Sequence, residues 1–200
     1  AVYIIDKQDI QLSGASTLPD LLEQVPGLLV APASSNTYAV GARGFAGVFA
    51  NKLLVMIDGR SLFSPLFSGV FWEMHDFFLA DIKRIEIIRG SGSSTWGANA
   101  INGIINIITE SSADTVNTLG YVRAGGNTEH DVGIRQGFEI GSQSFGRLYV
   151  KQMDFASNRT LVPGVLDSWQ SKAVGGKLDW FSGSNSHICP NTRRYCKNTC

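Results

Sequence analysis

A glycine-rich stretch after a β-branched run is the first place where this sequence could do chemistry. Residues 89–95 read Arg-Gly-Ser-Gly-Ser-Ser-Thr and invite comparison with a phosphate-binding loop. A P-loop requires Lys and then Ser or Thr after its last glycine, and the dinucleotide fingerprint requires Gly or Ala where Thr95 stands. A nucleophile elbow would need glycine in place of Trp96. The stretch therefore predicts a tight turn and neither a nucleotide site nor a hydrolase nucleophile.

Histidines and cysteines are the other side chains whose chemistry suits metal binding or acid–base work. His75 and His130 each lie beside acidic residues, but neither group has a second cluster at ligand spacing. All three cysteines lie at or after Cys189, near His187, and their spacing matches no usual zinc pattern. We therefore predict no catalytic residues, no metal site and no cofactor, and no enzymatic activity.

The overall composition excludes further classes. The 17 basic and 17 acidic residues balance, which argues against a nucleic-acid partner. No segment reaches the roughly 18 consecutive apolar residues that a membrane-spanning helix requires. The 22 glycines among 200 residues exceed the average usage of about 7% and suit tight turns and closely packed backbones.

The elements that must position any site begin with a small α/β unit over residues 1–110. Ser16 or Thr17 can cap a helix whose apolar side chains recur at spacings of three and four, and Pro26-Gly27 ends it. Asp58-Gly59 is a turn signal between strands, in which glycine supplies the positive φ. Residues 64–76 are loop-like and rich in large apolar groups. Strands are expected at 2–5, 28–30, 38–42, 53–57, 82–88 and 101–108.

Beyond residue 110 the pattern changes to extended segments, some of which have two distinct faces. Residues 132–140 place apolar and charged side chains on opposite faces, and residues 174–180 repeat this arrangement. Residues 116–124 and 145–155 have strand composition without clean faces. Blocks of about ten residues separated by turns fit a transmembrane β-barrel, and a soluble antiparallel sheet with one wet face fits equally well. In the first block the apolar face holds Val132, Ile134, Phe138 and Ile140, and the other face holds Arg135 and Glu139.

Residues 184–200 match neither pattern, because they lack alternation, contain no acidic residue and carry every cysteine. We expect this tail to be disordered, since it has few apolar side chains to bury. The predicted organisation is a first domain over residues 1–110, strands over 111–183, and the atypical tail over 184–200.

Five motifs in the first unit, taken in order and spacing, resemble the plug domain of TonB-dependent outer-membrane receptors. Three positions depart from the family pattern, which usually has Pro where Ser91 stands, Tyr at Trp96 and often Gly at Asn102. These departures are local changes in turns and packing. The matching motifs are residues 18–27 (LPDLLEQVPG), 40–45 (VGARGF), 54–60 (LVMIDGR), 82–90 (IKRIEIIRG) and 96–109 (WGANAINGIINIIT).

The resemblance implies an α+β plug domain with a small mixed sheet, followed by the first antiparallel strands of an incomplete transmembrane β-barrel in the outer membrane. In this family the plug fills a 22-stranded barrel. A TonB energy-transducing complex pulls on a short N-terminal box, which should lie upstream of Val2. Single-chain bacterial barrels have at least about eight strands, and about four are expected here, so this segment alone should not transport.

The implied function is ligand-gated import, with a ferric siderophore as the expected substrate because that class dominates the family. Cobalamin, haem and oligosaccharide stay open as substrates. A soluble periplasmic or secretin-like binding module is the alternative from another class. The resemblance also implies that the plug arginines Arg43 and Arg89 pair with carboxylates on the inner barrel wall, as plug arginines do in this family.

Two aromatic loops between strands are the expected ligand-binding surface, because loops on a rigid scaffold often carry binding. Burial of the second loop's aromatic side chains in the core or against the barrel is an equally good interpretation. The expected structural turns are Asp58, Gly59, Gly90 and Gly97. The expected ligand-binding residues are Phe45, Phe49, Asn51, Phe67, Phe71 and Trp72.

Overall fold

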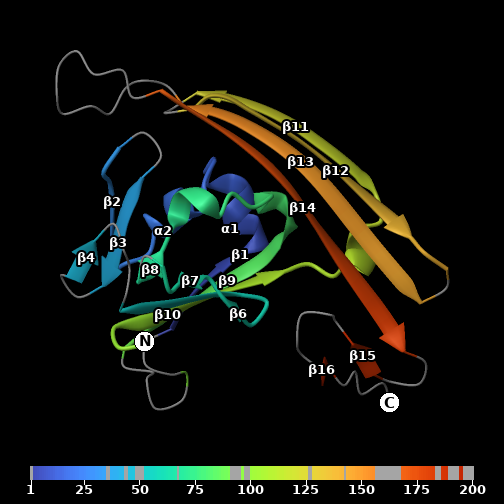
Figure 1. The fold of residues 1–200 in the computed structure, drawn as a ribbon, viewed down its shortest axis with the longest axis horizontal. Coiled ribbons are helices and arrows are strands. Elements are labelled where there is room, and N and C mark those ends of the chain that lie inside the picture. The colour runs from blue at the N-terminus through green and yellow to red at the C-terminus, as the bar shows by residue number, and fades with distance from the viewer. Residues whose placement is uncertain are drawn as a thin grey trace.

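The computed structural model places a compact N-terminal unit beside a curved antiparallel sheet, which runs along one side of it (Figure 1). The N-terminal unit extends to Glu110, and the four long strands that follow are called the wall below. The described residues are 2–34, 37–42, 45–47, 52–66, 68–90, 96, 100–125, 128–141, 143–155, 168–182, 186–188 and 194–195.

The N-terminal unit is built on a five-stranded mixed sheet with the order β1-β9-β10-β5-β6. β5 and β10 run parallel and the remaining neighbours antiparallel. The apolar runs predicted as strands form its centre, since every residue of β5 is buried and the inward side chains of β9 are isoleucines. The five strands are β1 (Val2–Asp6), β5 (Leu53–Ile57), β6 (Arg60–Ser61), β9 (Ile82–Arg89) and β10 (Gly103–Thr109).

Two short helices cover this sheet, and each begins with a reciprocal side-chain cap. Helix α2 (Leu18–Leu22) starts at the predicted Thr17, whose hydroxyl accepts from the Asp20 amide while the Asp20 carboxylate accepts from the Thr17 amide. Helix α1 (Lys7–Leu12) has the same arrangement at its start and was not predicted. Its single buried side chain, Ile10, gives too weak a periodicity for the sequence to reveal it.

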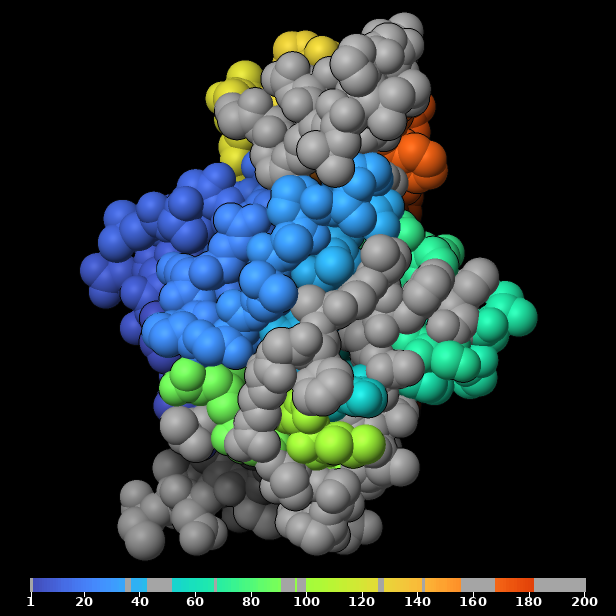
Figure 2. All heavy atoms as spheres, turned by 90° about the vertical axis from the view of Figure 1, so that its left-hand side faces the viewer, coloured from blue at the N-terminus to red at the C-terminus, as the bar shows by residue number. Residues whose placement is uncertain are grey.

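Smaller elements complete the N-terminal unit. The loop-like region predicted over 64–76 contains a two-stranded hairpin and a 3₁₀ turn, and a second 3₁₀ turn precedes β9. Viewed from the side of β2 and β3, the first part of the chain forms most of the surface and the wall shows only at the upper margin (Figure 2). These elements are β2 (Leu28–Pro32), β3 (Tyr38–Ala42), β4 (Phe45–Gly47), β7 (Phe63–Ser64), β8 (Gly69–Val70), η1 (Trp72–Met74) and η2 (Leu79–Asp81).

The wall is a continuous antiparallel sheet with strands in sequence order, as expected for residues 111–183. A 3₁₀ turn, η3 (Ser112–Thr115), connects it to the N-terminal unit. The described strands form an open sheet, which confirms the fold class of a mixed-sheet domain followed by antiparallel strands without closure. The wall strands are β11 (Thr118–Gly125), β12 (Thr128–Glu139), β13 (Ser144–Phe155) and β14 (Trp169–Ser182).

The tail differs from the expectation of disorder where the structure describes it. β15 (Ser186–Ile188) pairs with β14, and β16 (Arg194–Tyr195) pairs with β15. The outer edge of β14 presents unpaired backbone groups, and short segments of almost any sequence can pair with such an edge. Backbone pairing therefore extends past residue 183.

The two faces of the wall are reversed relative to a soluble sheet. Leu148, Val150 and Leu178 are each more than half exposed on the outer face, whereas Arg147 and Lys151 are buried on the inner face against the N-terminal unit. A soluble sheet with one wet face would bury the apolar side chains. Alternation with the apolar residues outward and the polar residues inward is the pattern of a transmembrane barrel wall. Among the described residues, no helix has both the length and the apolar character needed to cross a membrane.

Candidate functional site

The contact between the N-terminal unit and the wall is centred on one short segment, residues 76–81, called the docking segment below. It follows η1, includes η2, and directs side chains to opposite sides. Phe77 and Leu79 pack against the core of the N-terminal unit. Asp76, Phe78 and Asp81 contact the wall instead. An acidic, an aromatic and a second acidic side chain therefore present themselves to the wall in sequence.

Asp81 joins two wall arginines on neighbouring strands. Arg135 on β12 donates from Nη1 to Oδ1 at 2.8 Å, and Nε of Arg147 on β13 lies 3.1 Å from Oδ2 as an ion pair. All three side chains are 4–6% exposed. Burying charges is costly unless they are paired and otherwise hydrogen-bonded. Arg147 meets this condition by also donating to the Glu110 carbonyl at 2.9 Å, and Arg135 by donating to Asn117.

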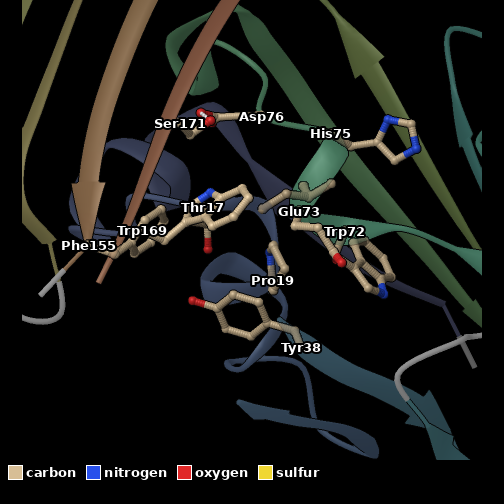
Figure 3. Close-up of a pocket in the computed structure, with 11 residues that line it drawn as sticks. Thr17, Pro19, Tyr38, Trp72, Glu73, His75, Asp76, Phe155, Trp169 and Ser171 are labelled. Atoms are coloured by element: carbon tan, nitrogen blue, oxygen red, sulfur yellow. Dashed lines mark hydrogen bonds between the residues drawn. The ribbon is translucent and has the colours of Figure 1, made fainter. Parts of the chain in front are cut away.

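Asp76 forms the second ionic contact, nearer the end of the wall where β13 stops and β14 begins. Lys151 Nζ lies 2.5 Å from Oδ1, and the Ser171 hydroxyl donates to Oδ2 at 3.2 Å. Figure 3 shows Ser171 beside Asp76. Lys151 is 1% exposed and also donates to the Ser16 carbonyl at 3.3 Å. A buried lysine is therefore satisfied entirely by the N-terminal unit.

Phe78 lies between these two carboxylates and contacts two wall tyrosines. Its ring centroid is 5.3 Å from that of Tyr121 and 5.6 Å from that of Tyr149. Each tyrosine faces a glycine on the next strand, because Tyr121 pairs with Gly133 and Tyr149 with Gly175. A Cβ would lie 2.7 Å from the Tyr121 ring at Gly133 and 2.4 Å from the Tyr149 hydroxyl at Gly175. Both glycines let the tyrosine rings lie along the sheet and leave a seat for Phe78.

A third ionic contact uses the predicted turn at Asp58-Gly59. Both residues have positive φ, 46° and 83°, so the turn needs the left-handed region at Asp58 as well as at the predicted Gly59. The Asp58 carboxylate accepts from the amide and hydroxyl of Thr109 at 2.8 and 2.6 Å. Lys177 Nζ lies 3.3 Å from Oδ2. The turn residue is therefore also a wall contact.

These contacts are not the ones expected of Arg43 and Arg89, whose pairing with wall carboxylates stays a prediction. Plug arginines were expected to meet wall carboxylates, but the described interdomain ion pairs join carboxylates of the N-terminal unit to wall cations. Arg89 donates to the Pro26 carbonyl, a contact inside the N-terminal unit. Arg43 lies outside the described residues. Charged side chains on the inner face of the wall were visible in the alternation, but their partners in residues 76–81 lie in a segment without periodicity.

The expected ligand-binding residues are distributed differently. Phe49, Asn51 and Phe67 lie outside the described residues, as does the turn residue Gly97, and only the backbone of Phe45 is described, in β4. Gly90 follows β9 with φ 137°, which favours glycine.

The two remaining aromatic residues, Phe71 and Trp72, differ in burial. Trp72 is 3% exposed and belongs to the core, whereas Phe71 is half-buried. Trp72 also lines a cavity of about 30 Å³, room for one water, with Tyr38 and wall residues Phe155 and Trp169 (Figure 3). Phe71 lines a wider, open hollow of about 330 Å³ with other residues of the same loop region.

Known proteins resemble this chain both in sequence and in structure. The family described as the TonB-dependent Receptor Plug Domain matches residues 1–104. The vitamin B12 transporter BtuB of Vibrio cholerae serotype O1 is 30% identical over 169 residues, which are 83% of this chain and 27% of the relative. BtuB of Vibrio vulnificus is 30% identical over 130 residues, 64% of this chain and 20% of the relative. The chain therefore spans about a quarter of the length of these curated relatives.

Solved structures share the fold across both parts of the chain. The siderophore receptor PirA from Acinetobacter baumannii superposes with a TM-score of 0.69 at 18% identity, covering 93% of this chain and 30% of that one. The ferric yersiniabactin uptake receptor FyuA from Yersinia pestis gives 0.67 at 16% identity, covering 93% and 29%. At such identities the likeness concerns the fold.

Proposed function

This chain belongs to the TonB-dependent receptor family through its plug domain, and from that premise we propose that it holds the plug and first wall strands of an outer-membrane importer. Receptors of this family lie in the outer membrane with the plug inside the barrel lumen. The plug would block the lumen at rest and move when substrate is bound. A TonB energy-transducing complex, acting on an N-terminal box, is the proposed partner.

The polar contact between the plug and the wall is the observation that carries this proposal. Phe78 is the aromatic anchor, while Asp58, Asp76 and Asp81 bind the wall through ion pairs and hydrogen bonds. Such contacts exchange for water when the two bodies separate, unlike the continuous apolar core inside the plug. A plug held in this way can be seated firmly and still be released without unfolding the wall.

A ferric siderophore is the proposed substrate, and cobalamin is the second candidate because the similar curated proteins are named vitamin B12 transporters. The structurally similar receptors are named for siderophores. Both classes are bulky metal chelates that are scarce outside the cell, which suits an energised carrier. Measured uptake separates them.

A disulfide between plug and wall tests the gating step. Asp76→Cys with Ser171→Cys joins two positions whose side-chain oxygens are now 3.2 Å apart. Cys189, Cys196 and Cys200 are replaced by Ser in the full-length receptor to prevent other pairings. Cells lacking their own iron and cobalamin receptors are supplied with ⁵⁵Fe-siderophore or ⁵⁷Co-cobalamin.

The oxidised pair should bind substrate and fail to import it, and reduction should restore import. Each single cysteine variant is the matched control and should import regardless of oxidation. If the cells import ⁵⁷Co-cobalamin but no ⁵⁵Fe-siderophore, the substrate is cobalamin and the siderophore proposal is wrong. If the disulfide-bonded variant imported substrate as fast as the same variant after reduction, plug displacement would be refuted as the gate.

A further inference from the structure

The inner face of the wall is predominantly cationic where it meets the docking segment. Arg135 and Arg147 share one carboxylate, and Lys151 takes the other. Both carboxylates belong to the plug, and the inward cations of the described wall outnumber its inward carboxylates. The buried or half-buried inward charges of the described wall are the cations Arg123, Arg135, Arg147, Lys151 and Lys177 and the carboxylates Asp131 and Asp179.

The two wall carboxylates have hydrogen-bond partners of their own. Asp131 accepts from the Tyr121 hydroxyl at 2.9 Å and lies 3.8 Å from Arg123, and Asp179 accepts from the Ser112 amide at 2.5 Å. Withdrawal of the docking segment would thus remove the directly paired carboxylates from two adjacent guanidinium groups and an ammonium, and Asp131 and Asp179 would remain as the nearby wall carboxylates. Two like charges at close range favour binding of an anion between them. A lumen lined by one sign of charge also concentrates mobile ions of the opposite sign.

Aromatic surface becomes available at the same place. Phe78 separates Asp76 from Asp81 in the sequence, and its ring occupies the seat between Tyr121 and Tyr149. The docking segment therefore presents acidic, aromatic and acidic groups to a complementary surface of cations and tyrosines. A guanidinium fork matches planar groups that carry two oxygens, such as carboxylates and catecholates.

We propose that Arg135, Arg147 and Lys151, with Tyr121 and Tyr149, form a binding site in the wall for anionic aromatic groups. Asp76, Phe78 and Asp81 occupy this site at rest, and the anionic aryl groups of the passing substrate occupy it when the plug moves. The transport role of the site rests on the proposed function, while its ligand chemistry can be measured without transport. A neutral substrate would make none of its ionic contacts.

Direct binding to the purified full-length receptor in detergent tests the site itself. Phe78→Ala with Asp81→Ala empties the aromatic seat and the arginine pair, and 4-fluorobenzoate is the probe, observed by ¹⁹F NMR. The probe signal should broaden with this double variant and stay sharp with the unaltered receptor. The neutral isostere 4-fluorobenzamide should stay sharp with both. Circular dichroism checks that each variant keeps its β structure.

Wall substitutions then identify the cations. Adding Arg135→Gln and Arg147→Gln to the double variant should abolish the broadening. Adding Lys172→Gln should preserve it, because Lys172 is exposed on the outer face of β14. No broadening by the double variant, or equal broadening after both glutamine substitutions, overturns the proposal. If the double variant fails to fold, Phe78→Ala with the size-conserving Asp81→Asn replaces it, with the same probe and the same two outcomes.

Uptake in cells provides the second arm. With ⁵⁵Fe bound to an anionic catecholate chelate, Arg147→Gln should lower uptake several-fold and Arg147→Lys should recover part of it. Absence of uptake by the unaltered receptor would count against the proposed function and leave the NMR result to decide the site. Uptake by the unaltered receptor that is equal in Arg147→Gln would overturn the site's role in substrate passage.

Discussion

Asp81→Asn isolates the ionic part of plug docking. The substitution keeps the size of the side chain and its ability to accept from Arg135, but it removes the charge shared by the two arginines. Removing one partner of a buried ion pair costs about 3–5 kcal/mol, because the remaining charge is left uncompensated. The side chains here are 4–6% exposed, so little screening by water reduces this cost.

This free energy should appear as more frequent opening of the docking segment. At about 1.4 kcal/mol per tenfold change, the open population should rise roughly a hundred- to several-thousand-fold. Hydrogen exchange of the amides in residues 76–81 of the full-length receptor, measured by mass spectrometry, reports that population. The rate should rise by the same factor in Asp81→Asn.

Glu86→Gln is the matched control, because it makes the same change from acid to amide in a more exposed pair. The Arg84 and Glu86 side chains are 39% and 26% exposed and are 2.8 Å apart, and such pairs contribute about 0–1 kcal/mol. Exchange in the docking segment should barely change in this control. A rise below tenfold in Asp81→Asn, or equal rises in both variants, would refute buried charge as the main ionic restraint on the plug.

Three further predictions follow from single positions. Gly137→Ala should destabilise the chain by about 1–3 kcal/mol, because its Cβ would lie 1.9 Å from the Thr115 carbonyl oxygen. Gly120→Ala, whose Cβ has nothing nearer than 3.9 Å, should be tolerated in the same urea titration. Phe78→Ala should cost about 3–5 kcal/mol, since the ring is 1% exposed, and should speed exchange in residues 76–81. Plug stability should fall as pH drops below 6.5, the ordinary pKa of histidine, because the pKa of His75 is lowered in the folded chain. Burial is the main cause of the lower pKa. A backbone hydrogen bond with Leu62 raises the pKa, and the charge of Arg60 lowers it.

The sign of the pH effect follows from proton binding. Between the lowered pKa and 6.5 the unfolded chain takes up a proton at His75 and the folded chain does not, so acid favours unfolding. His75→Gln should flatten that part of the curve, and an unchanged slope would contradict the prediction. Equal free energies of unfolding for Gly137→Ala and Gly120→Ala would contradict the packing argument at Gly137. An unchanged rate of hydrogen exchange in residues 76–81 of Phe78→Ala would contradict the packing argument at Phe78.

The sequence by itself determined the main strands of the plug, its second helix and the presence of a wall. The apolar run at residues 53–57 and the isoleucines of residues 82–88 indicate buried strands, and Thr17 with Asp20 defines a helix start locally. The motif order identified the family. These features depend on neighbours in sequence, so no tertiary information was needed.

Only the tertiary structure decided which face of the wall is inside and which residues hold the plug. Alternation over residues 132–140 separates two faces but does not say which one meets protein, and the buried Arg135 settles it. The plug carboxylates that bind Arg135, Arg147 and Lys151 lie in residues 76–81, which contain no regular element besides a 3₁₀ turn and are 54 or more residues from these cations in the chain. Electrostatic pairing depends on distance in space, and no periodicity in the sequence encodes a contact between an irregular segment and a strand. For that reason the sequence predicted a wall and a plug but did not reveal the carboxylates of residues 76–81 that join them.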